Sequence, residues 1–475
     1  MKKAINYLPL FLLLILLAVR FGADFNGLYG QDSHEYLRFA KRLVAFFQNG
    51  SPPGDYFWPV NYPLFSAFFA LVLPDAAFAA QLVSMLSFVL LISYATRLIA
   101  LLNPQASPLQ TRVYLFLTLF LSPFMFRASL LVMSDILAAF FVIAAIFYAL
   151  NYRRDAVTLD FVLSVFFAAA AVMTRYAAAV LLIVPLAGML PVFRRKFSLA
   201  AFVLALAAIA VCLTPHLLIR GDHAAAFLQH PGLLTWSIDN FFHREFITSD
   251  GHAVYRFPNL VYAFSFLFHP GFFWLALPLI FFFKTSDLKN VNCRLLLAEL
   301  VIYAAFLAGI PYQNLRFLIP GFPLVAVMFF PAFARLTARL QRRKMIVWGI
   351  AAFILLAQIA LITRYFSPIY QANKLEKSVA QTVLDYPNRT IYTFAIDGAL
   401  RSYGVKNKLV NLWREPIRKV DPGSLALFNE EKFARQWAGK NPMLNWHWLR
   451  QNFQLIELET LPDGWRLYEI KNECY

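Results

Sequence analysis

The sequence GQDSHEY occupies residues 30–36, directly after the first hydrophobic stretch of the chain. A carboxylate, Asp32, stands there ahead of an amphipathic segment, residues 33–48. Apolar residues recur in that segment at helical spacing, namely Tyr36, Phe39, Ala40, Leu43 and Phe47. This pattern predicts a helix that lies in the plane of a membrane interface with its apolar side down. It therefore predicts a membrane protein with a carboxylate at the membrane surface.

The composition agrees with this prediction. Of 475 residues, 60% are hydrophobic and 15% are charged, whereas soluble domains carry about 25% charged residues. The formal net charge of +17 is explained by basic loops that hold topology against an anionic membrane face. We therefore expect no nucleic-acid partner. The three cysteines, Cys212, Cys293 and Cys474, are separated by the predicted topology and give no disulfide framework.

Hydrophobic stretches of membrane-spanning length predict an all-α polytopic membrane protein with about eleven transmembrane helices. The predicted segments are 7–23, 76–100, 112–126, 131–151, 159–174, 176–192, 198–219, 259–283, 295–311, 317–334 and 345–365. The first is interpreted as an uncleaved span, because the apolar run ends at Arg20 without a small-residue cleavage site.

Lys and Arg residues set the orientation. If the spans alternate, the basic clusters fall on one side, from Lys2 and Lys3 to the run Arg342, Arg343 and Lys344. The positive-inside rule makes that side cytoplasmic. We expect residues 1–366 to form the transmembrane module. Its outer face carries loops 24–75 and 220–258, and residues 367–475 form an extracytoplasmic α/β domain.

Asp32 has two interpretations. With Glu35 three residues later it matches a capping box, in which Asp32 is the N-cap of the interfacial helix. It can also be a general base at the membrane surface, and both hold together because a capping carboxylate keeps one oxygen free. Further along the first outer loop, WPVNYPL at 58–64 opens an apolar run that ends at Pro74. We interpret this run as a half-helix in the outer leaflet; the alternative is an ordinary span.

Charged residues also collect at the predicted outer ends of spans. Asp135 lies about one turn into its span and follows Arg127 in FRASLLVMSD, residues 126–135. An ion pair of Asp135 with Arg127 and a functional role for Asp135 are equally supported. Four more arginines fall at outer ends: Arg175, Arg220, Arg316 and Arg364. Each alone can be a snorkelling residue, whereas together they can bind a phosphate headgroup.

Metal and nucleotide motifs are missing from the sequence. His216, His223 and His230 are spaced by seven residues, which places them about 10.5 Å apart on a helix, too far for one metal ion. The aromatic residues of loop 220–258 suit an interfacial belt or a lid over a lipid-linked substrate.

The C-terminal residues change to a polar composition. Helices are predicted at 370–385, 397–403 and 430–438, and strands at 389–394 and 425–428. Residues 453–459 and 465–470 are predicted to pair as a hairpin across LPDG.

This organisation resembles the GT-C superfamily of membrane glycosyltransferases, in particular the bacterial branch related to protein O-mannosyltransferases and aminoarabinose transferases. DSHEYLRFA at 32–40 resembles the first-outer-loop motif of that branch, and NYPL at 61–64 resembles its Tyr-Pro-Pro-Leu element with one Pro missing. MSD at 133–135 and TR at 174–175 fall in segments of familiar form, and NLRFLIP at 314–320 resembles its Arg-Tyr-Leu-Leu-Pro segment. Many members have a second acid directly after the first Asp, where this chain has Ser33, so a metal-binding pair does not carry over.

The resemblance implies a bacterial inner-membrane enzyme that moves a sugar from a polyprenyl-phosphate donor to the hydroxyl of a lipid, glycan or protein acceptor. Asp32 is the expected base, acting with inversion at the anomeric carbon. Arg127, Arg175 or Arg316 would contact the donor phosphate, Asp135 would orient the acceptor or an ion, and Tyr62 joins this set through its motif. The sequence assigns no cofactor, and a divalent cation, Mg²⁺ or Mn²⁺, is an alternative to Arg for offsetting the phosphate charge.

Three other functions compete with this one. A lipid-linked sugar transporter or flippase would carry polar groups near the bilayer midplane and inverted repeats, and a polysaccharide polymerase would share the transferase chemistry. A non-catalytic scaffold would tolerate loss of Asp32 apart from helix capping.

Overall fold

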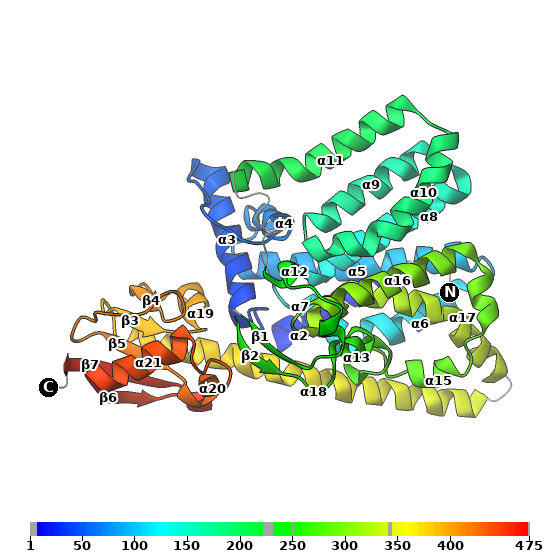
Figure 1. Ribbon diagram of the computed structural model, residues 1–475. Helices are drawn as coiled ribbons and strands as arrows, with labels where there is room; N and C mark the ends of the chain where they lie inside the picture. Colours follow the sequence, from blue (N-terminus) through cyan, green and yellow to red (C-terminus); the bar gives the residue numbers. More distant parts are fainter. Residues whose placement is uncertain (1–6, 222–230, 249, 341–343, 474–475) are drawn as a thin grey trace. The chain divides into compact units, whose positions relative to one another are not determined.

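The computed structural model describes residues 7–221, 231–248, 250–340 and 344–473 (Figure 1). The predictions for Lys2, Lys3, His223, His230 and Cys474 lie outside these residues. The chain divides into two compact units. The first contains Met1–Gly27, Phe39–Phe242 and Pro258–Ser367, and the second contains Leu28–Arg38, His243–Phe257 and Pro368–Tyr475.

The first unit is helical throughout most of its described length. Its helices are α2 (Leu8–Gly22), α4 (Asn61–Ala70), α5 (Ala76–Leu102), α6 (Pro108–Leu115), α7 (Pro123–Leu130), α8 (Asp135–Asp155), α9 (Thr158–Val172), α10 (Ile183–Arg195), α11 (Leu199–Arg220), α12 (Pro231–Leu234), α13 (Asn259–Ala263), α14 (Pro270–Phe273), α15 (Ala276–Ile280), α16 (Val291–Gly309) and α17 (Phe322–Leu340). Two further helices, α3 (Gly30–Asn49) and α18 (Lys344–Leu384), contribute residues to both units.

Seven described helices are long and apolar enough to cross a membrane, or eight if the bent pair that ends in α7 is one span. Two shorter apolar helices, α2 and α9, add to them. The prediction of an all-α polytopic membrane protein with a small C-terminal α/β domain is therefore confirmed, while the count of eleven spans stays a prediction.

Proline residues explain where the predicted spans fail. The continuous span expected at 259–283 is wrong, because the structure breaks it into α13, α14 and α15. His269, directly before Pro270, has the extended backbone that a following proline favours. The expected span at 112–126 is likewise interrupted by a bend of 73° just before α7, where Ser122 precedes Pro123 and is also extended.

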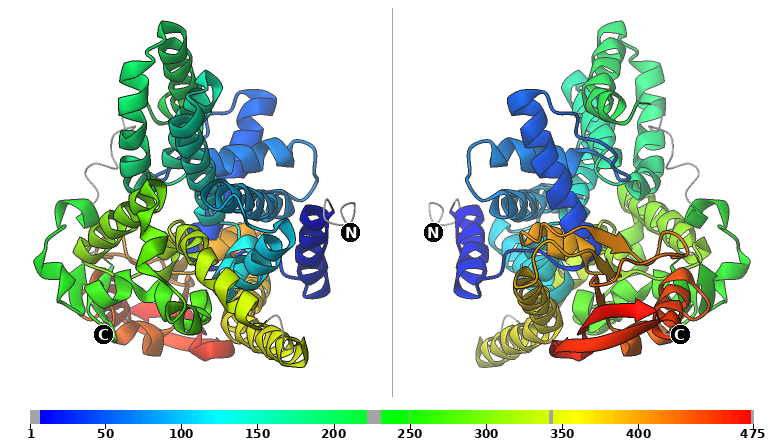
Figure 2. Two further views of the ribbon diagram at one scale, coloured as in Figure 1. Left: turned by 90° about the vertical axis from the view of Figure 1, so that its right-hand side faces the viewer. Right: turned by 90° about the vertical axis from the view of Figure 1, so that its left-hand side faces the viewer.

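Helix α8 forms the centre of a helical layer. It packs against α5, α9 and α10, and α9 packs in turn against α11 (Figures 1 and 2). Of the hydrophobic window in α8, 83% is buried, the largest share among the candidate spans of the described chain. Residues that start or border α8 are consequently held by a close-packed interior.

Helix α3 differs from the predicted interfacial helix in what covers it. Tyr36, Phe39, Ala40 and Leu43 are buried in protein. The Phe39 ring stacks on Tyr56 with centroids 4.0 Å apart. The expectation that this whole apolar face lies on lipid is therefore wrong, because other parts of the chain cover most of it.

The run after Trp58 forms α4, a helix of ten residues. Such a helix is about 15 Å long, half of the hydrocarbon thickness of about 30 Å. The structure therefore supports the half-helix and excludes an ordinary span at this position.

The second unit is built on a five-stranded mixed sheet with the order β4-β3-β5-β7-β6. Its strands are β3 (Ile391–Thr393), β4 (Leu409–Asn411), β5 (Leu425–Phe428), β6 (Phe453–Thr460) and β7 (Arg466–Glu473). Strand β3 runs parallel to β4 and β5, and the β6–β7 pair is the predicted antiparallel hairpin. Helices α19 (Asp397–Ser402), α20 (Glu430–Ala434) and α21 (Asn441–Asn452) complete this part.

Two features of the second unit differ from the prediction. The span at 345–365 and the helix at 370–385 are one continuous helix, α18, with Pro368 inside it. The aromatic residues of loop 220–258 were expected to form an interfacial belt or a lid. The described part of this loop contains a hairpin of β1 (Glu245–Thr248) and β2 (Gly251–Val254), which the sequence did not predict. The hairpin joins this unit through His252, whose backbone N–H donates to the Gln436 carbonyl at 2.7 Å.

Candidate active site

Asp135 is held between two arginines in the first unit. Its Oδ1 accepts a hydrogen bond from Arg175 Nη1, and its Oδ2 accepts one from Arg316 Nε at 3.0 Å. Asp135 is 1% exposed, and the side chains of Arg175 and Arg316 are 13% and 19% exposed. This cluster is named the Asp135 clamp below.

Three breaks in helical structure bring the clamp together. Asp135 is the first residue of α8, where an acidic side chain is stabilised by the helix dipole. Arg175 lies in extended backbone between α9 and the 3-10 helix η2 (Tyr176–Leu182). Arg316 lies in the 3-10 helix η8 (Leu315–Leu318), and its backbone N–H is capped by the Asn314 side chain at 3.0 Å. Each charged residue thus sits where the chain turns at the end of an apolar helix.

Two tyrosines hold the segment that carries Arg316. The Tyr262 hydroxyl donates to the Asn314 carbonyl at 2.6 Å and accepts from the Asn314 N–H at 3.2 Å. The Tyr303 hydroxyl donates to the Phe317 carbonyl at 2.5 Å. Both tyrosines are buried, so Arg316 is presented from a fixed backbone.

The charges of the clamp determine what it can do chemically. Within the clamp, two guanidinium groups bind one carboxylate in a largely buried setting. Arg175 also lies over the Phe317 ring, 4.7 Å from its centroid. Because both carboxylate oxygens are engaged by Arg, Asp135 is suited to positioning the guanidinium groups. Two guanidinium groups brought together in this way are suited to binding phosphate.

Arg127 is not the ion-pair partner that the sequence predicted for Asp135. Its guanidinium lies over the Phe124 ring at 4.3 Å from the centroid. His269 and Tyr365 pack against the same ring, with centroid distances of 4.8 and 5.0 Å. The nearest arginine in sequence is thus directed to an aromatic cluster, while more distant arginines pair with Asp135.

Tyr62 lies in the interior of the first unit. It is 0% exposed, and its hydroxyl donates to the Ala80 carbonyl at 2.9 Å and lies 3.0 Å from Ser84 Oγ. These contacts join α4 to α5. The structure gives Tyr62 a packing role, and the predicted contact with substrate stays a prediction.

Asp32 belongs to the second unit and lies in the first turn of α3. The predicted capping box is wrong, because α3 begins at Gly30 and Asp32 is already inside it. Ser33 Oγ accepts from the Tyr29 N–H at 2.6 Å, and the Glu35 carboxylate pairs with Arg38. Asp32 is therefore not needed as the cap, and it is partly exposed.

The residues beside Asp32 are fastened to the C-terminal part of the same unit. His34 Nε2 lies 2.9 Å from Glu376 Oε2 and its Nδ1 lies 2.9 Å from Ser402 Oγ. Gln31 Nε2 donates to Asp397 Oδ1 at 3.0 Å. His34 is 2% exposed. This attachment was not predicted from the sequence. The pattern that could have indicated it is the polar pair Gln31 and His34, which are spaced by about one helical turn.

The predicted arginines are only partly brought together. Arg175 and Arg316 meet at Asp135, whereas Arg220 ends α11 and Arg364 lies within α18. Within the described ranges, no three His, Cys, Asp or Glu side chains group as a metal site. The divalent cation stays a prediction.

Comparisons with known proteins bear on the family. ArnT from Cupriavidus metallidurans bound to undecaprenyl phosphate aligns over 97% of this chain and 97% of its own, with a TM-score of 0.64 and 13% identity. The apo oligosaccharyltransferase of Archaeoglobus fulgidus aligns over 97% of this chain and 74% of its own, with a TM-score of 0.52 and 13% identity. The AglB protein of that organism, in complex with an inhibitory peptide and a dolichol-phosphate, aligns over 98% and 74%, with a TM-score of 0.50 and 12% identity. At such identities the likeness concerns the fold.

The sequence comparisons add one match. No curated protein sequence matches the chain. The profile of the Alg9-like mannosyltransferase family matches residues 24–390, well over half of the chain. The protein therefore belongs to the Alg9-like mannosyltransferase family and is a GT-C membrane glycosyltransferase.

Proposed function

We propose that this glycosyltransferase moves a sugar from a polyprenyl-phosphate donor to an acceptor hydroxyl on the outer face of a bacterial inner membrane, with inversion at the anomeric carbon. The observation that carries this proposal is the Asp135 clamp. Two guanidinium groups held side by side by a buried carboxylate suit the phosphate of a lipid-linked donor. The sugar, the acceptor and the side of the membrane are parts of the proposal.

The proposed chemistry needs one base and one group of cations. The base removes the proton of the acceptor hydroxyl while its oxygen forms a bond to the anomeric carbon. The bond between that carbon and the phosphate oxygen breaks, and polyprenyl phosphate leaves with the electron pair. Phosphate leaves without a general acid, unlike the alcohol in a glycosidase. Arg175 and Arg316 would stabilise the charge that develops on it.

Asp32 is the proposed base. It is a partly exposed carboxylate at the start of a helix whose neighbouring residues, Gln31 and His34, are tied to the surrounding unit. A base that must align with an acceptor oxygen benefits from such a fixed backbone. Arg127 is the less favoured phosphate ligand, because it lies over the Phe124 ring and does not share the carboxylate that brings Arg175 and Arg316 together.

Two solved structures with a similar fold contain a lipid phosphate, which supports a lipid-linked donor. The ArnT structure contains undecaprenyl phosphate and the AglB structure contains a dolichol-phosphate. The proposed orientation has the N-terminus in the cytoplasm and residues 367–475 outside, and it rests on the basic clusters predicted to share one face.

The test uses purified full-length protein in nanodiscs, a panel of polyprenyl-phosphate sugars and a count of released polyprenyl phosphate. We expect Asp32→Asn to reduce turnover by about 10²–10⁴-fold, the range for loss of a general base. Glu35→Gln is the matched control, because it removes a carboxylate from the same helix turn and breaks only the partly exposed pair with Arg38. Turnover by Asp32→Asn at the wild-type rate would refute the assignment of the base.

Two further outcomes separate the competing functions. If no donor is consumed while labelled lipid-linked sugar crosses the bilayer of a proteoliposome, the transporter or flippase is correct. If the product lengthens with each turnover, the protein is a polysaccharide polymerase. Repeating the assay with EDTA and with added Mg²⁺ or Mn²⁺ tests the place for a divalent cation.

A further inference from the structure

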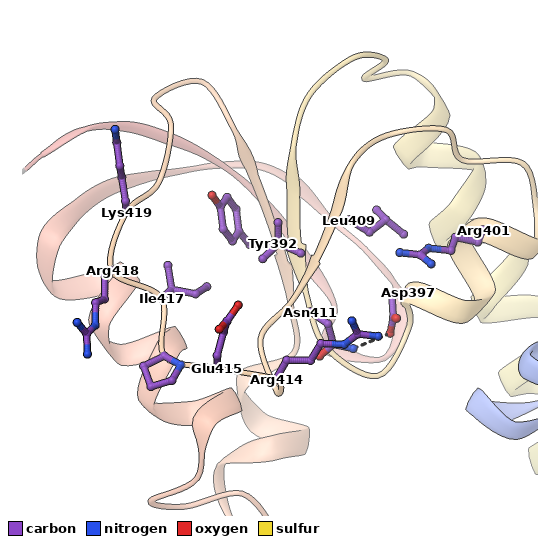
Figure 3. A pocket seen from close by; sticks show the side chains of 12 residues that line it. Tyr392, Asp397, Arg401, Leu409, Asn411, Arg414, Glu415, Ile417, Arg418 and Lys419 are labelled. Carbon is purple, nitrogen blue, oxygen red and sulfur yellow. Dashed lines mark hydrogen bonds between the residues drawn. The ribbon is translucent and has the colours of Figure 1, made fainter. Parts of the chain in front are cut away.

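The second unit contains a hollow that the proposed chemistry does not use (Figure 3). Its volume is about 380 Å³, within the range of small-molecule sites. Twelve residues line it, all from residues 392–419. The hollow is therefore formed within one compact part of the chain.

The topology of the sheet explains why a hollow forms there. Strands β3 and β4 are parallel, with Tyr392 opposite Val410 and Thr393 opposite Asn411. Asn411 ends β4, and Asp397 follows β3 at the start of α19. In open parallel sheets, ligands bind outside the carboxyl ends of the strands. The hollow occupies that position.

The lining is strongly charged. Four cationic residues, Arg401, Arg414, Arg418 and Lys419, and two acidic residues, Asp397 and Glu415, line the hollow, so two positive charges are in excess. Figure 3 shows Arg401 and Arg414 beside Asp397 and Asn411 at one end, with Arg418 and Lys419 on the loop at the other.

This mixture of groups selects a kind of ligand. Guanidinium groups bind carboxylate or phosphate through paired hydrogen bonds. The two carboxylates and the Asn411 amide offer partners for hydroxyl groups. Tyr392, the pKa of whose hydroxyl is raised by burial, also lines the hollow. An oxyanion on a hydroxyl-rich molecule satisfies both kinds of lining group.

We propose that this hollow binds an acidic saccharide, bearing a carboxylate or a phosphate ester, as the acceptor of the transfer reaction. The assignment to an acceptor rests on the proposed function, whereas the chemistry of the ligand rests on the lining residues.

A hydrogen-bonded connection leads from the hollow to the proposed base. Asp397 Oδ1 accepts from Asn411 Nδ2 at 3.2 Å and from Gln31 Nε2 at 3.0 Å. Gln31 directly precedes Asp32 in α3, and a Cβ added to Gly398 would lie 2.7 Å from Gln31 Oε1. Only the Gln31 side chain would thus stand between a saccharide bound to Asp397 and the helical turn that contains Asp32.

The experiment measures binding to full-length protein in nanodiscs by calorimetry, without donor. The probes are a disaccharide with a glucuronate, its uncharged methyl ester and a phosphorylated disaccharide. We expect the double variant Arg401→Gln/Arg414→Gln to bind a charged probe at least tenfold more weakly. Arg435→Gln, an exposed arginine of the same unit outside the hollow, is the matched control and should stay within twofold of wild type.

The relative affinities for the three probes identify the ligand of the hollow. Preference for the glucuronate probe indicates a carboxylate ligand, and preference for the phosphorylated probe indicates a phosphate ester. If wild type binds neither charged probe more tightly than the uncharged methyl ester, or if the double variant binds the preferred charged probe as tightly as wild type does, the proposal is overturned. If the double variant unfolds below the wild-type temperature, Arg418→Gln/Lys419→Gln replaces it with the same expectation.

Failure of the proposal is distinguishable from failure of the proposed function. In the absence of acceptor, hydrolysis of the donor by water should proceed at the wild-type rate in the double variant, because the hollow does not hold the donor. Wild-type protein that binds the acidic probe but consumes no donor would refute the transferase function and retain the saccharide site.

Discussion

Arg316 Nε donates a hydrogen bond to Asp135 Oδ2 at 3.0 Å, across 181 positions of the sequence. Arg175 binds the other oxygen from 40 positions away. The carboxylate at the start of α8 therefore binds two segments that are far apart in the sequence. The same ion pairs therefore stabilise the first unit and set the positions of Arg175 and Arg316.

Removing the charge of Asp135 should destabilise the protein. Asp135→Asn keeps the size of the side chain but removes the carboxylate charge that pairs with two largely buried guanidinium groups, and breaking a buried ion pair costs about 3–5 kcal/mol. We expect a lower midpoint of thermal unfolding in detergent, together with reduced consumption of donor.

A double-mutant cycle provides the control. Asp135→Asn/Arg175→Gln removes both charges of one ion pair, so the double variant should be less destabilised than the sum of the single variants. Additive effects of the two substitutions would contradict a direct ion pair.

The geometry of the guanidinium group should matter as well as its charge. Arg316→Lys keeps the positive charge but loses the planar fork that allows one side chain to bond Asp135 while presenting further donors. We expect KM for the lipid donor to rise about tenfold, equivalent to roughly one charge-assisted hydrogen bond. The measurement is initial rate against donor concentration.

Arg127→Lys is the comparison for that substitution. Lysine retains a cation over the Phe124 ring, so donor KM should change less than twofold. A larger effect in Arg127→Lys than in Arg316→Lys would move the phosphate site from the Asp135 clamp to the aromatic cluster.

The sequence predicts the site unevenly, for physical reasons. An acid inside an apolar span is costly, so Asp135 could be singled out from its position alone. Its partners could not, because Arg175 and Arg316 reach it through tertiary packing, and the sequence neighbour Arg127 was the wrong choice. Strands β3 and β5 and the β6–β7 hairpin were visible in residue patterns, whereas β4 has three residues and gives too little pattern to recognise.

Glu299 is another residue whose partner is set by tertiary packing and is not visible in the sequence. It is a carboxylate within a candidate span, and nothing in the sequence around it indicates its partner. In the structure its Oε2 accepts a hydrogen bond from the Val184 N–H at 2.6 Å, next to the start of α10. The first N–H groups of a helix lack partners within the helix, so Glu299 satisfies backbone at a helix break. That role depends on which helix start packs nearby, and sequence alone does not provide it.

The attachment of α3 should depend on His34. His34→Ala removes the contacts with Glu376 and Ser402 and leaves buried polar atoms unsatisfied, at about 1–3 kcal/mol each. We expect faster amide hydrogen exchange in residues 28–38, measured by mass spectrometry on full-length protein, and a loss of turnover because Asp32 lies in that segment.

A second His–Glu pair of the same unit serves as its control. His252 and Glu245 are 2.7 Å apart, but their side chains are 38% and 62% exposed, compared with 1% and 13% for His34 and Glu376. Exposed pairs contribute little, so His252→Ala should leave exchange in residues 28–38 and turnover unchanged. Equal effects of both substitutions would show that the attachment does not hold α3.

Tyr62 offers a test that separates packing from substrate contact. Its hydroxyl is enclosed between α4 and α5 and lies 3.0 Å from Ser84 Oγ. Tyr62→Phe removes this hydroxyl and leaves the ring in place, so it should lower stability by about 1 kcal/mol, the net value of a typical hydrogen bond. KM for the donor should stay unchanged.

Ser84→Ala is the matched variant for Tyr62→Phe, because it removes the other side of the same contact. Ser84 Oγ also donates to the Leu131 carbonyl at 2.7 Å, so Ser84→Ala should cost more than Tyr62→Phe, and the double variant less than their sum. If the hydroxyl of Tyr62 instead reaches the donor during turnover, Tyr62→Phe will raise KM while Ser84→Ala leaves it unchanged. That pattern would require α4 to uncover its buried face, since the hydroxyl is enclosed in the structure described above.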